Sequence, residues 1–513
     1  MKKLYFSLII LLPLFLNSCG GTGNGDYKVE NRFIYDAMSN YYYWAKDMKS
    51  KKPTTDDPFI YFESLLNATD KKQGWSFITD DVQGLIAEYS GTPKEFGFAL
   101  VGVGIKDTIR NVIKKDTIYV LIKYVYPNSP AANAGLKRLD LIVAIDGEPI
   151  TRKNSDKFFG KEKITVTKLV KVPTITGFDY VEEDIDITPA TINTDPVLYK
   201  NFYEIGGKKI GYLFYTSFIP NYHSSLYNAF QYFKDNGVTD LILDLRYNHG
   251  GAVSTAAYLA SLVAPRSVVA SKSTYAIMNY NAEVNAAFAD NNWSREYNLG
   301  NFNQPDKDPV GANLNLNKVY IIATGDSYSA SELTIHCLRP HMNVVHVGDS
   351  TGGKYTASWT IHAYIEKWSN VSLTMPLYKE SSLKKSEKET LLKWAIQPIV
   401  AIYTDKNKED FSETTGSKKH NGCLVPDHEI KEGFGYIDGW CEIGDTQDVL
   451  LGEALYQITG DISLKPAPPT PIKVAGMGTQ RAKTATFNID NPNETKNRAV
   501  WIDNMPNIPT THY

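Results

Sequence analysis

The 513-residue sequence has a small net charge, few cysteines and, after its first residues, no long apolar run. A net charge of −3 provides no field that would attract nucleic acid, so we expect no nucleic-acid partner. The sequence has no Cys-x-x-Cys motif, no His-x-x-x-His pair with a carboxylate and no Gly-Lys-Ser/Thr phosphate loop. It therefore predicts neither a metal site nor a cofactor. No later segment has 18 consecutive apolar residues, so we expect no second membrane element.

Only four cysteines are present, and three of them follow the N-terminal segment. Cys423 and Cys441 lie 18 residues apart in a turn-rich region. They form either a disulfide, if the protein is exported, or two reduced thiols. Cys337 lies in a predicted helix, where its neighbour His336 does not face it, so we interpret it as a small core residue.

Residues 1–18 have the pattern of an export signal, with a positive start and an apolar run from Leu4 to Leu16 that is too short to span a bilayer. The segment ends in Ser18 and Cys19, which resembles the bacterial lipoprotein signal. The resemblance implies lipidation of Cys19, with an ordinary cleaved signal as the alternative. Residues 19–30 read as a flexible tether because they are rich in glycine. We therefore expect a protein of the bacterial cell envelope, periplasmic or outer-membrane facing, that touches the membrane only through its N-terminal lipid.

Three folded units are predicted after the tether, which together give a mixed α/β fold class. Residues 31–88 have the spacing of amphipathic helices, and we interpret them as a helical N-terminal domain. Residues 89–190 resemble a PDZ domain, in which a Pro-containing turn leads to a short Ala-rich helix and then a strand ending in Asp146-Gly147. By this resemblance Phe96, Gly97 and Phe98 form the loop that binds a peptide carboxylate, the alternative being a small β domain without a ligand.

Residues 191–460 alternate strands with helices, as an α/β catalytic core does. Within this core, 271–317 is predicted to be a long functional or disordered loop. Residues 461–513 begin with a Pro-rich spacer and show little periodicity, so two alternatives stay open for this tail. It either docks on the core or remains mobile.

The chemistry is concentrated in two short stretches. Ser329 follows a predicted strand and begins a predicted helix, where free N–H groups favour developing negative charge. A capping box formed by Ser329 and Glu332 explains the same residues without catalysis. Lys354 follows the next strand through a Gly-rich turn. To act as a general base, the pKa of its amine must fall from about 10.4 to about 7, which burial supplies. We therefore expect Lys354 to be buried near Ser329 without a carboxylate partner.

A third stretch, Asp244-Leu245-Arg246 followed by Gly250-Gly251, ends another strand at the edge where α/β folds bind ligands. Either glycine is a candidate donor of an N–H group to an oxyanion, with the Ala330 N–H as the second donor. A structural turn is the alternative for this motif.

Together these motifs resemble the C-terminal processing (tail-specific) peptidases, in which Gly-Lys follows the nucleophile by 25 residues, as Lys354 follows Ser329. The resemblance covers about residues 30 to 460 and implies that Ser329 is the nucleophile and Lys354 the general base. Many members carry Gln four residues after the lysine and others Asp 11 residues after the serine; this chain has Ser358 and Pro340 there. Ser358 is therefore the candidate for the third catalytic residue, with a weaker hydrogen bond to the lysine amine than glutamine would make.

The resemblance implies a serine endopeptidase that cleaves envelope or imported proteins and peptides, near C-termini presented by the PDZ domain. Two other classes remain open. The first is a peptide-binding lipoprotein scaffold with an impaired catalytic core, for which Ser358 and Pro340 would be signs. The second is an envelope protein that binds sugar or lipid without proteolysis.

Overall fold

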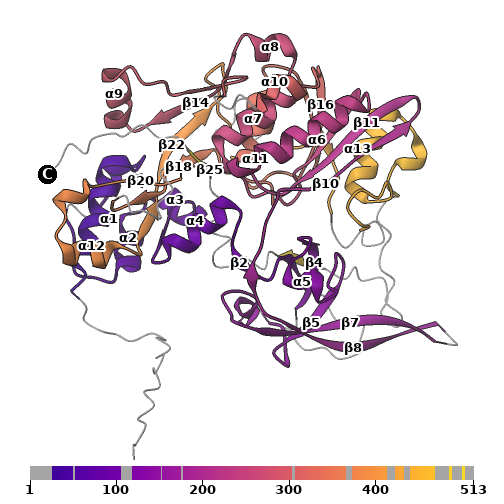
Figure 1. The fold of residues 1–513 in the computed structure, drawn as a ribbon, viewed down its shortest axis with the longest axis horizontal. Coiled ribbons are helices and arrows are strands. Elements are labelled where there is room, and N and C mark those ends of the chain that lie inside the picture. Colours follow the sequence, from indigo (N-terminus) through magenta and orange to yellow (C-terminus); the bar gives the residue numbers. More distant parts are fainter. Residues whose placement is uncertain are drawn as a thin grey trace, which may run out of the picture.

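The structure is a computed structural model of the chain. It describes residues 26–49, 52–104, 118–151, 153–174, 177–302, 307–364, 373–412, 422–432, 440–467, 485–487 and 500–502. The predicted mixed α/β class is confirmed: a helical N-terminal region, a β domain and an α/β core follow one another along the chain. In Figure 1 the β domain lies below the α/β core, and the N-terminal helices lie to the left of the core.

The N-terminal region contains four helices: α1 Lys28–Tyr41, α2 Pro58–Leu65, α3 Ala68–Gln73 and α4 Val82–Ser90. Helix α1 buries one face, which includes Phe33, Ala37 and Tyr41, as the helical spacing predicts. These side chains share a continuous hydrophobic core with the α/β unit, and the Tyr41 ring packs edge-on against Trp359 at 5.5 Å. The helices are therefore an integral part of the core's packing.

The β domain is a twisted antiparallel sheet that matches the predicted PDZ unit. Its described strands include β3 Phe98–Gly104, β4 Tyr119–Val125, β5 Leu141–Ile145, β7 Ile164–Thr174 and β8 Gly177–Ile187, in that spatial order. Helix α5 Pro130–Asn133 is short and begins at Ser129, whose hydroxyl accepts the Ala132 N–H at 3.2 Å. Strand β3 directly follows the predicted carboxylate-binding loop.

The main sheet of the α/β core has the order β10-β11-β12-β16-β17-β23. The bounds of its strands are β10 Val197–Ile205, β11 Lys208–Tyr215, β12 Asp240–Asp244, β16 Lys318–Ala323, β17 Asn343–Gly348 and β23 His428–Glu429. All neighbouring pairs after β10–β11 are parallel. Because strand side chains alternate between faces, Leu241 and Leu243 share a core with helices α6 His223–Asp235, α7 Val253–Val263 and α11 Ala330–Leu338. Ile242 faces helix α13 Val449–Thr459 on the opposite side.

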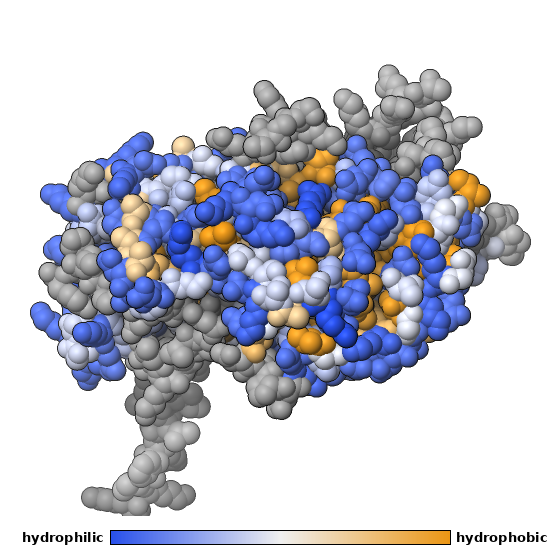
Figure 2. Space-filling view, turned by 90° about the horizontal axis from the view of Figure 1, so that it is seen from above, coloured by the Kyte–Doolittle hydropathy of each residue, from blue (hydrophilic) through white to orange (hydrophobic). Residues whose placement is uncertain are grey.

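A second sheet runs beside the first in the order β13-β25-β18-β22-β14-β15. Its strands are β13 Gly251–Ala252, β25 Val500–Trp501, β18 Thr356–Ser358, β22 Ile399–Thr404, β14 Thr274–Tyr280 and β15 Glu296–Asn298. A smaller sheet, β1 Phe77–Thr79, β21 Ala395–Gln397, β19 Ile361–His362 and β20 Met375–Pro376, joins the N-terminal region to the core. The face in Figure 2 mixes hydrophilic side chains with smaller apolar areas.

Three expectations need comparison with this fold. The loop predicted over 271–317 is wrong, since this stretch forms β14, helix α9 Ala282–Asp290, β15 and helix α10 Pro309–Ala312. Its apolar residues fill the shared core, where Tyr275 and Met278 are buried.

Cys423 and Cys441 are unpaired, and Cys337 is buried, as predicted. The described parts of the tail, 485–487 and 500–502, dock as strands β24 Ala485–Phe487 and β25.

Within the described residues, no helix combines the length and the apolar character needed to cross a bilayer. Cys19 and the predicted export signal lie outside the residues that the structure describes.

Candidate active site

Ser329 lies at the junction between strand β16 and helix α11, which it precedes by one residue. Its backbone has φ +66°, a conformation that is uncommon for a residue with a side chain. Its hydroxyl is buried and makes no hydrogen bond with any described residue. Glu332 accepts the Ser329 N–H at 2.7 Å, as the predicted capping box requires.

The Glu332 carboxylate joins the nucleophile segment to the lysine segment. One oxygen, Oε2, accepts the N–H groups of both Ser329 at 2.7 Å and Lys354 at 2.8 Å. The other, Oε1, accepts the Gly353 N–H at 2.7 Å and the Thr351 hydroxyl at 2.5 Å. Burial raises the pKa of Glu332, and these four donors oppose the rise. Ser329 and Lys354 are thus neighbours through one shared acceptor, although 25 residues separate them in sequence.

A second connection between the same two residues comes from strand β22. The buried Tyr403 hydroxyl lies 3.0 Å from the Lys354 carbonyl and 3.3 Å from the Ser329 carbonyl. Since Glu332 binds their N–H groups and Tyr403 their carbonyls, the backbones of both residues are held in place from two directions.

Lys354 is 1% exposed, so the predicted burial is confirmed. Asp70 of helix α3 is near enough for the two charges to interact. Burial raises the pKa of Asp70, whereas hydrogen bonds from Ser76 and Tyr42 and the interaction with Lys354 lower it. The sequence alone did not predict this neighbour, because it comes from the N-terminal helices that pack on the core.

Ser358 is buried four residues after Lys354, on strand β18. Its Oγ accepts a hydrogen bond from Gln397 Nε2 at 2.8 Å. Gln397 comes from strand β21, and its Oε1 accepts the Tyr89 hydroxyl of helix α4. An amide thus reaches the site, although the sequence has serine at the position where many relatives of the resembled family carry glutamine. No local motif marks Gln397, so only the fold shows it.

Of the two candidate oxyanion glycines, Gly250 lies against the candidate nucleophile, whereas Gly251 packs against Phe218. A Cβ built on Gly250 would lie 2.8 Å from the Ser329 Cβ and 3.0 Å from the Ala330 nitrogen. Glycine at 250 therefore keeps open the space in front of Ser329 and Ala330. The Gly250 N–H donates to Asn248 Oδ1 at 2.8 Å, and Gly251 is the first residue of strand β13.

The predicted peptide-binding residues Phe96, Gly97 and Phe98 line a pocket of about 550 Å³ between the PDZ domain and helix α4. The Phe96 side chain is buried in the PDZ core and Phe98 is half-buried. Gly97 has φ +88°, and a Cβ there would lie 2.2 Å from the Ser129 Cβ, so glycine is required. The pocket thus has one wall from each of two domains.

The PDZ domain is attached to the core by buried charges. Arg138 donates to the carbonyl oxygen of Cys441 at 2.7 Å and pairs with Glu432 at 3.2 Å. Lys123 of β4 pairs with Asp326 at 3.2 Å, only three residues before Ser329. The PDZ domain therefore contacts the loop that precedes the candidate nucleophile.

Within the described residues, no group of three His, Cys, Asp or Glu side chains has the arrangement to hold a metal ion.

Comparisons with known proteins agree with this architecture. Residues 209–398 match the family model of peptidase family S41, residues 30–77 the peptidase S41 N-terminal domain and residues 121–161 a PDZ domain. A Bacteroides fragilis protein assigned to the S41 proteases shares the fold, with a TM-score of 0.60 and 24% identity over 83% of this chain and 97% of that chain.

Among curated relatives, the carboxyl-terminal-processing protease of Picosynechococcus is 26% identical over 243 residues, 46% of this chain and 54% of that protein. The carboxy-terminal-processing protease of Bartonella bacilliformis is 25% identical over 395 residues, 75% of this chain and 79% of that protein. The chain spans about half the length, or less, of the first curated relatives that it matches. The S41 N-terminal domain, a PDZ domain and the S41 domain are thus matched in chain order, as in a protein built from the domains of an S41 peptidase.

Proposed function

We propose that the protein is a serine endopeptidase in which Ser329 is the nucleophile and Lys354 the general base. The observation that carries the proposal is the shared Glu332 oxygen, which holds the backbones of both residues side by side while the Ser329 hydroxyl makes no hydrogen bond with a described residue. Burial of Lys354 also favours the neutral amine that a general base needs.

In the proposed reaction, Ser329 Oγ attacks the carbonyl carbon of the peptide bond and its proton passes to the neutral Lys354 amine. The N–H groups of Ala330 and of either Gly250 or Gly251 stabilise the oxyanion that forms. The protonated lysine gives its proton to the leaving amine, and an acyl-enzyme remains on Ser329. Water then attacks the ester, losing its proton to Lys354, and releases the new carboxylate and the free hydroxyl.

Ser358 acts through Lys354 in this proposal, as a positioning residue. The Gln397 amide fixes the Ser358 hydroxyl, so that this oxygen is held in one orientation beside the lysine segment. The PDZ pocket at Phe96, Gly97 and Phe98 presents the C-terminal part of an extended protein or peptide substrate, whose carboxylate meets backbone N–H groups of the loop.

The test uses the chain without residues 1–18 and β-casein, a natively unfolded protein, as substrate. Ser329→Ala and Lys354→Ala are each expected to abolish cleavage while the melting temperature and PDZ peptide binding stay near wild type. A wild-type protein that binds β-casein without cleaving it would instead support the scaffold alternative. Cleavage that persists in either variant would contradict the proposed pair.

We further propose that Cys19 carries a lipid and anchors the protein to the bacterial cell envelope, periplasmic or outer-membrane facing. The sequence pattern of residues 1–19 supports this proposal. Metabolic labelling with a fatty acid is expected to mark the wild type and not Cys19→Ser. Equal labelling of both, or of neither, would contradict it.

A further inference from the structure

The C-terminal tail contributes two short strands at two different sheets. Strand β24, residues 485–487, pairs with β3 of the PDZ domain, and strand β25, residues 500–501, enters the second sheet of the catalytic core. Both positions border parts of the candidate site.

At the PDZ domain, β24 occupies the edge of β3 that an added peptide strand would use. One side of β3 is paired with β4, and β24 pairs with the other side, antiparallel, with Ala485 opposite Gly104 and Phe487 opposite Gly102. This direction leads from the far end of β3 toward the loop at Phe96–Phe98. A peptide whose C-terminus binds that loop would run in the same direction.

At the catalytic core, β25 lies between two strands that carry candidate site residues. Val500 pairs with Gly251 of β13, and Trp501 pairs with both Ala252 and Ser358 of β18. The Ile502 N–H donates to the Ser358 carbonyl at 3.0 Å. The tail thus connects the candidate oxyanion strand to the strand that follows the candidate base.

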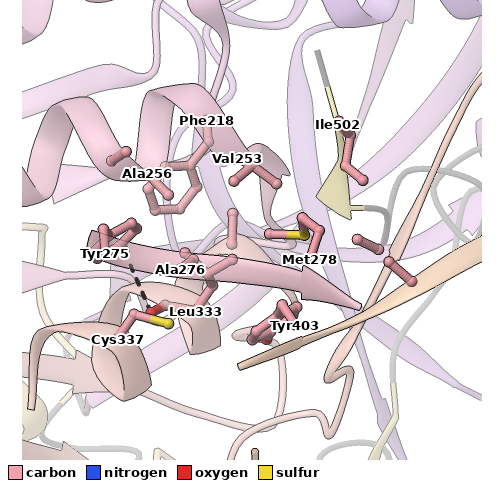
Figure 3. Close-up of a cluster of buried hydrophobic side chains, with 14 of the residues drawn as sticks. Phe218, Val253, Ala256, Tyr275, Ala276, Met278, Leu333, Cys337, Tyr403 and Ile502 are labelled. Carbon is pink, nitrogen blue, oxygen red and sulfur yellow. Dashed lines mark hydrogen bonds between the residues drawn. The ribbon is translucent and has the colours of Figure 1, made fainter. Parts of the chain in front are cut away.

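One side chain anchors this contact. Ile502 is 3% exposed and belongs to the large hydrophobic core. In Figure 3 it points into the cluster that contains Val253 and Met278.

The site is closed in this arrangement. Ser329 and Ser358 are both 0% exposed, so a protein substrate has no access to the hydroxyl of the nucleophile. Some element at the site must therefore move before a substrate binds. The tail strands are short, two and three residues, and a Pro-rich spacer from Pro466 to Pro471 separates them from helix α13.

We propose that the C-terminal tail is an intramolecular competitor of the substrate, which occupies the two strand positions that an extended polypeptide must take during cleavage. This proposal rests on the proposed function. Because the spacer keeps the tail at a high effective concentration, a short and weak strand pair is enough to block the site. A substrate that binds both the PDZ edge and the catalytic sheet displaces the tail from both.

The first test compares β-casein cleavage by the full chain, by Ile502→Asp and by Ile462→Asp. A charge at the buried position 502 is expected to release β25. Because a tethered competitor is then lost, kcat/KM should rise roughly tenfold. Ile462 is 70% exposed at the start of the tail and serves as the matched control, with unchanged activity. An Ile502→Asp protein that keeps its melting temperature but gains no activity would overturn the proposal.

A second test covers the case in which Ile502→Asp does not fold. Residues 466–471 are replaced by the recognition sequence of a site-specific protease, and the purified protein is cut at this position. On dilution the cut protein is expected to cleave β-casein faster than the uncut protein, and a synthetic peptide of residues 472–513 should inhibit it competitively. If the uncut protein cleaves β-casein, a cut protein of equal or lower activity that the peptide does not inhibit would overturn the proposal.

A third experiment distinguishes a failure of the tail proposal from a failure of the proposed function. In cut Ser329→Ala protein, a fluorescent 472–513 peptide is expected to bind and β-casein to displace it, although no bond is cleaved. If the cut wild type also cleaves nothing while displacement persists, the tail proposal stands and the hydrolase proposal fails. If cleavage depends on Ser329 but β-casein never displaces the peptide, only the tail proposal fails.

Discussion

At the scale of single residues, the site depends on a carboxylate that contacts no substrate. Each Glu332 oxygen accepts two donors, so an amide in its place would direct an NH₂ group at two N–H or O–H donors. Glu332→Gln is therefore expected to displace Ser329 from Lys354 and to lower kcat by about 100-fold, as small errors in position do. The measurement is kcat on β-casein, beside the melting temperature.

Glu453→Gln is the matched control for this prediction. Glu453 is also a mostly buried glutamate on a helix, but it lies on α13 on the opposite side of the main sheet. Its variant is expected to retain activity. If Glu332→Gln kept full activity too, the carboxylate would have no positioning role.

A second residue-scale prediction concerns Gly250. A methyl group there would meet the Ser329 Cβ and the Ala330 nitrogen at 3.0 Å or less. Gly250→Ala is expected to lower kcat by about 100-fold or more, comparable to the loss of an oxyanion donor. Gly207→Ala is the control, because Gly207 also has a positive φ, +78°, but no atom near its ideal Cβ. Equal losses in both variants would show that backbone strain, and not the blocked space, explains the effect.

At the scale of elements, strand β17 contains a buried histidine that makes the fold sensitive to acid. Burial lowers the pKa of His346 from 6.5 to about 4. The unfolded chain therefore binds a proton more readily, and the stabilisation present above pH 6.5 is lost as the pH falls toward 4. The loss between pH 7 and pH 5 amounts to about 2 kcal/mol.

His346→Leu is expected to remove this part of the pH dependence. Denaturant unfolding at pH 7 and pH 5 gives the difference in the free energy of unfolding for each protein. The wild type should lose about 2 kcal/mol more than the variant. The same difference for both proteins would mean that other groups cause the acid sensitivity.

At the scale of the whole molecule, the PDZ domain and the nucleophile loop are joined by the Lys123–Asp326 pair, whose lysine side chain is 6% exposed. Lys123→Met is expected to loosen the loop before Ser329 and to lower kcat/KM roughly tenfold. Lys168→Met removes a similar, half-buried pair with Asp140 inside the PDZ domain and should leave kcat/KM unchanged. Equal effects of both substitutions would indicate that only PDZ stability matters.

Much of the architecture could be predicted because local patterns agree with the tertiary fold. The strand Lys318–Ala323 and the helix Ala330–Leu338 lie before and after Ser329 as predicted, since a buried apolar run and an apolar helical stretch are local signals. The stretch 271–317 was misread as a loop. Strand β14 shows little alternation of apolar and polar residues, because both of its faces are buried. The Asn residues of the same stretch suggested turns.

The sequence by itself determined the family, the order of the domains and the candidate pair Ser329 and Lys354, because these depend on short motifs with fixed spacing. Only the tertiary structure decided which residues surround that pair and Ser358. Tyr403, Gln397 and Asp70 come from distant segments, and packing of β22, β21 and α3 brings them to the site. The same holds for the tail, whose strands β24 and β25 have no local signal and form only where the edges of other strands accept them.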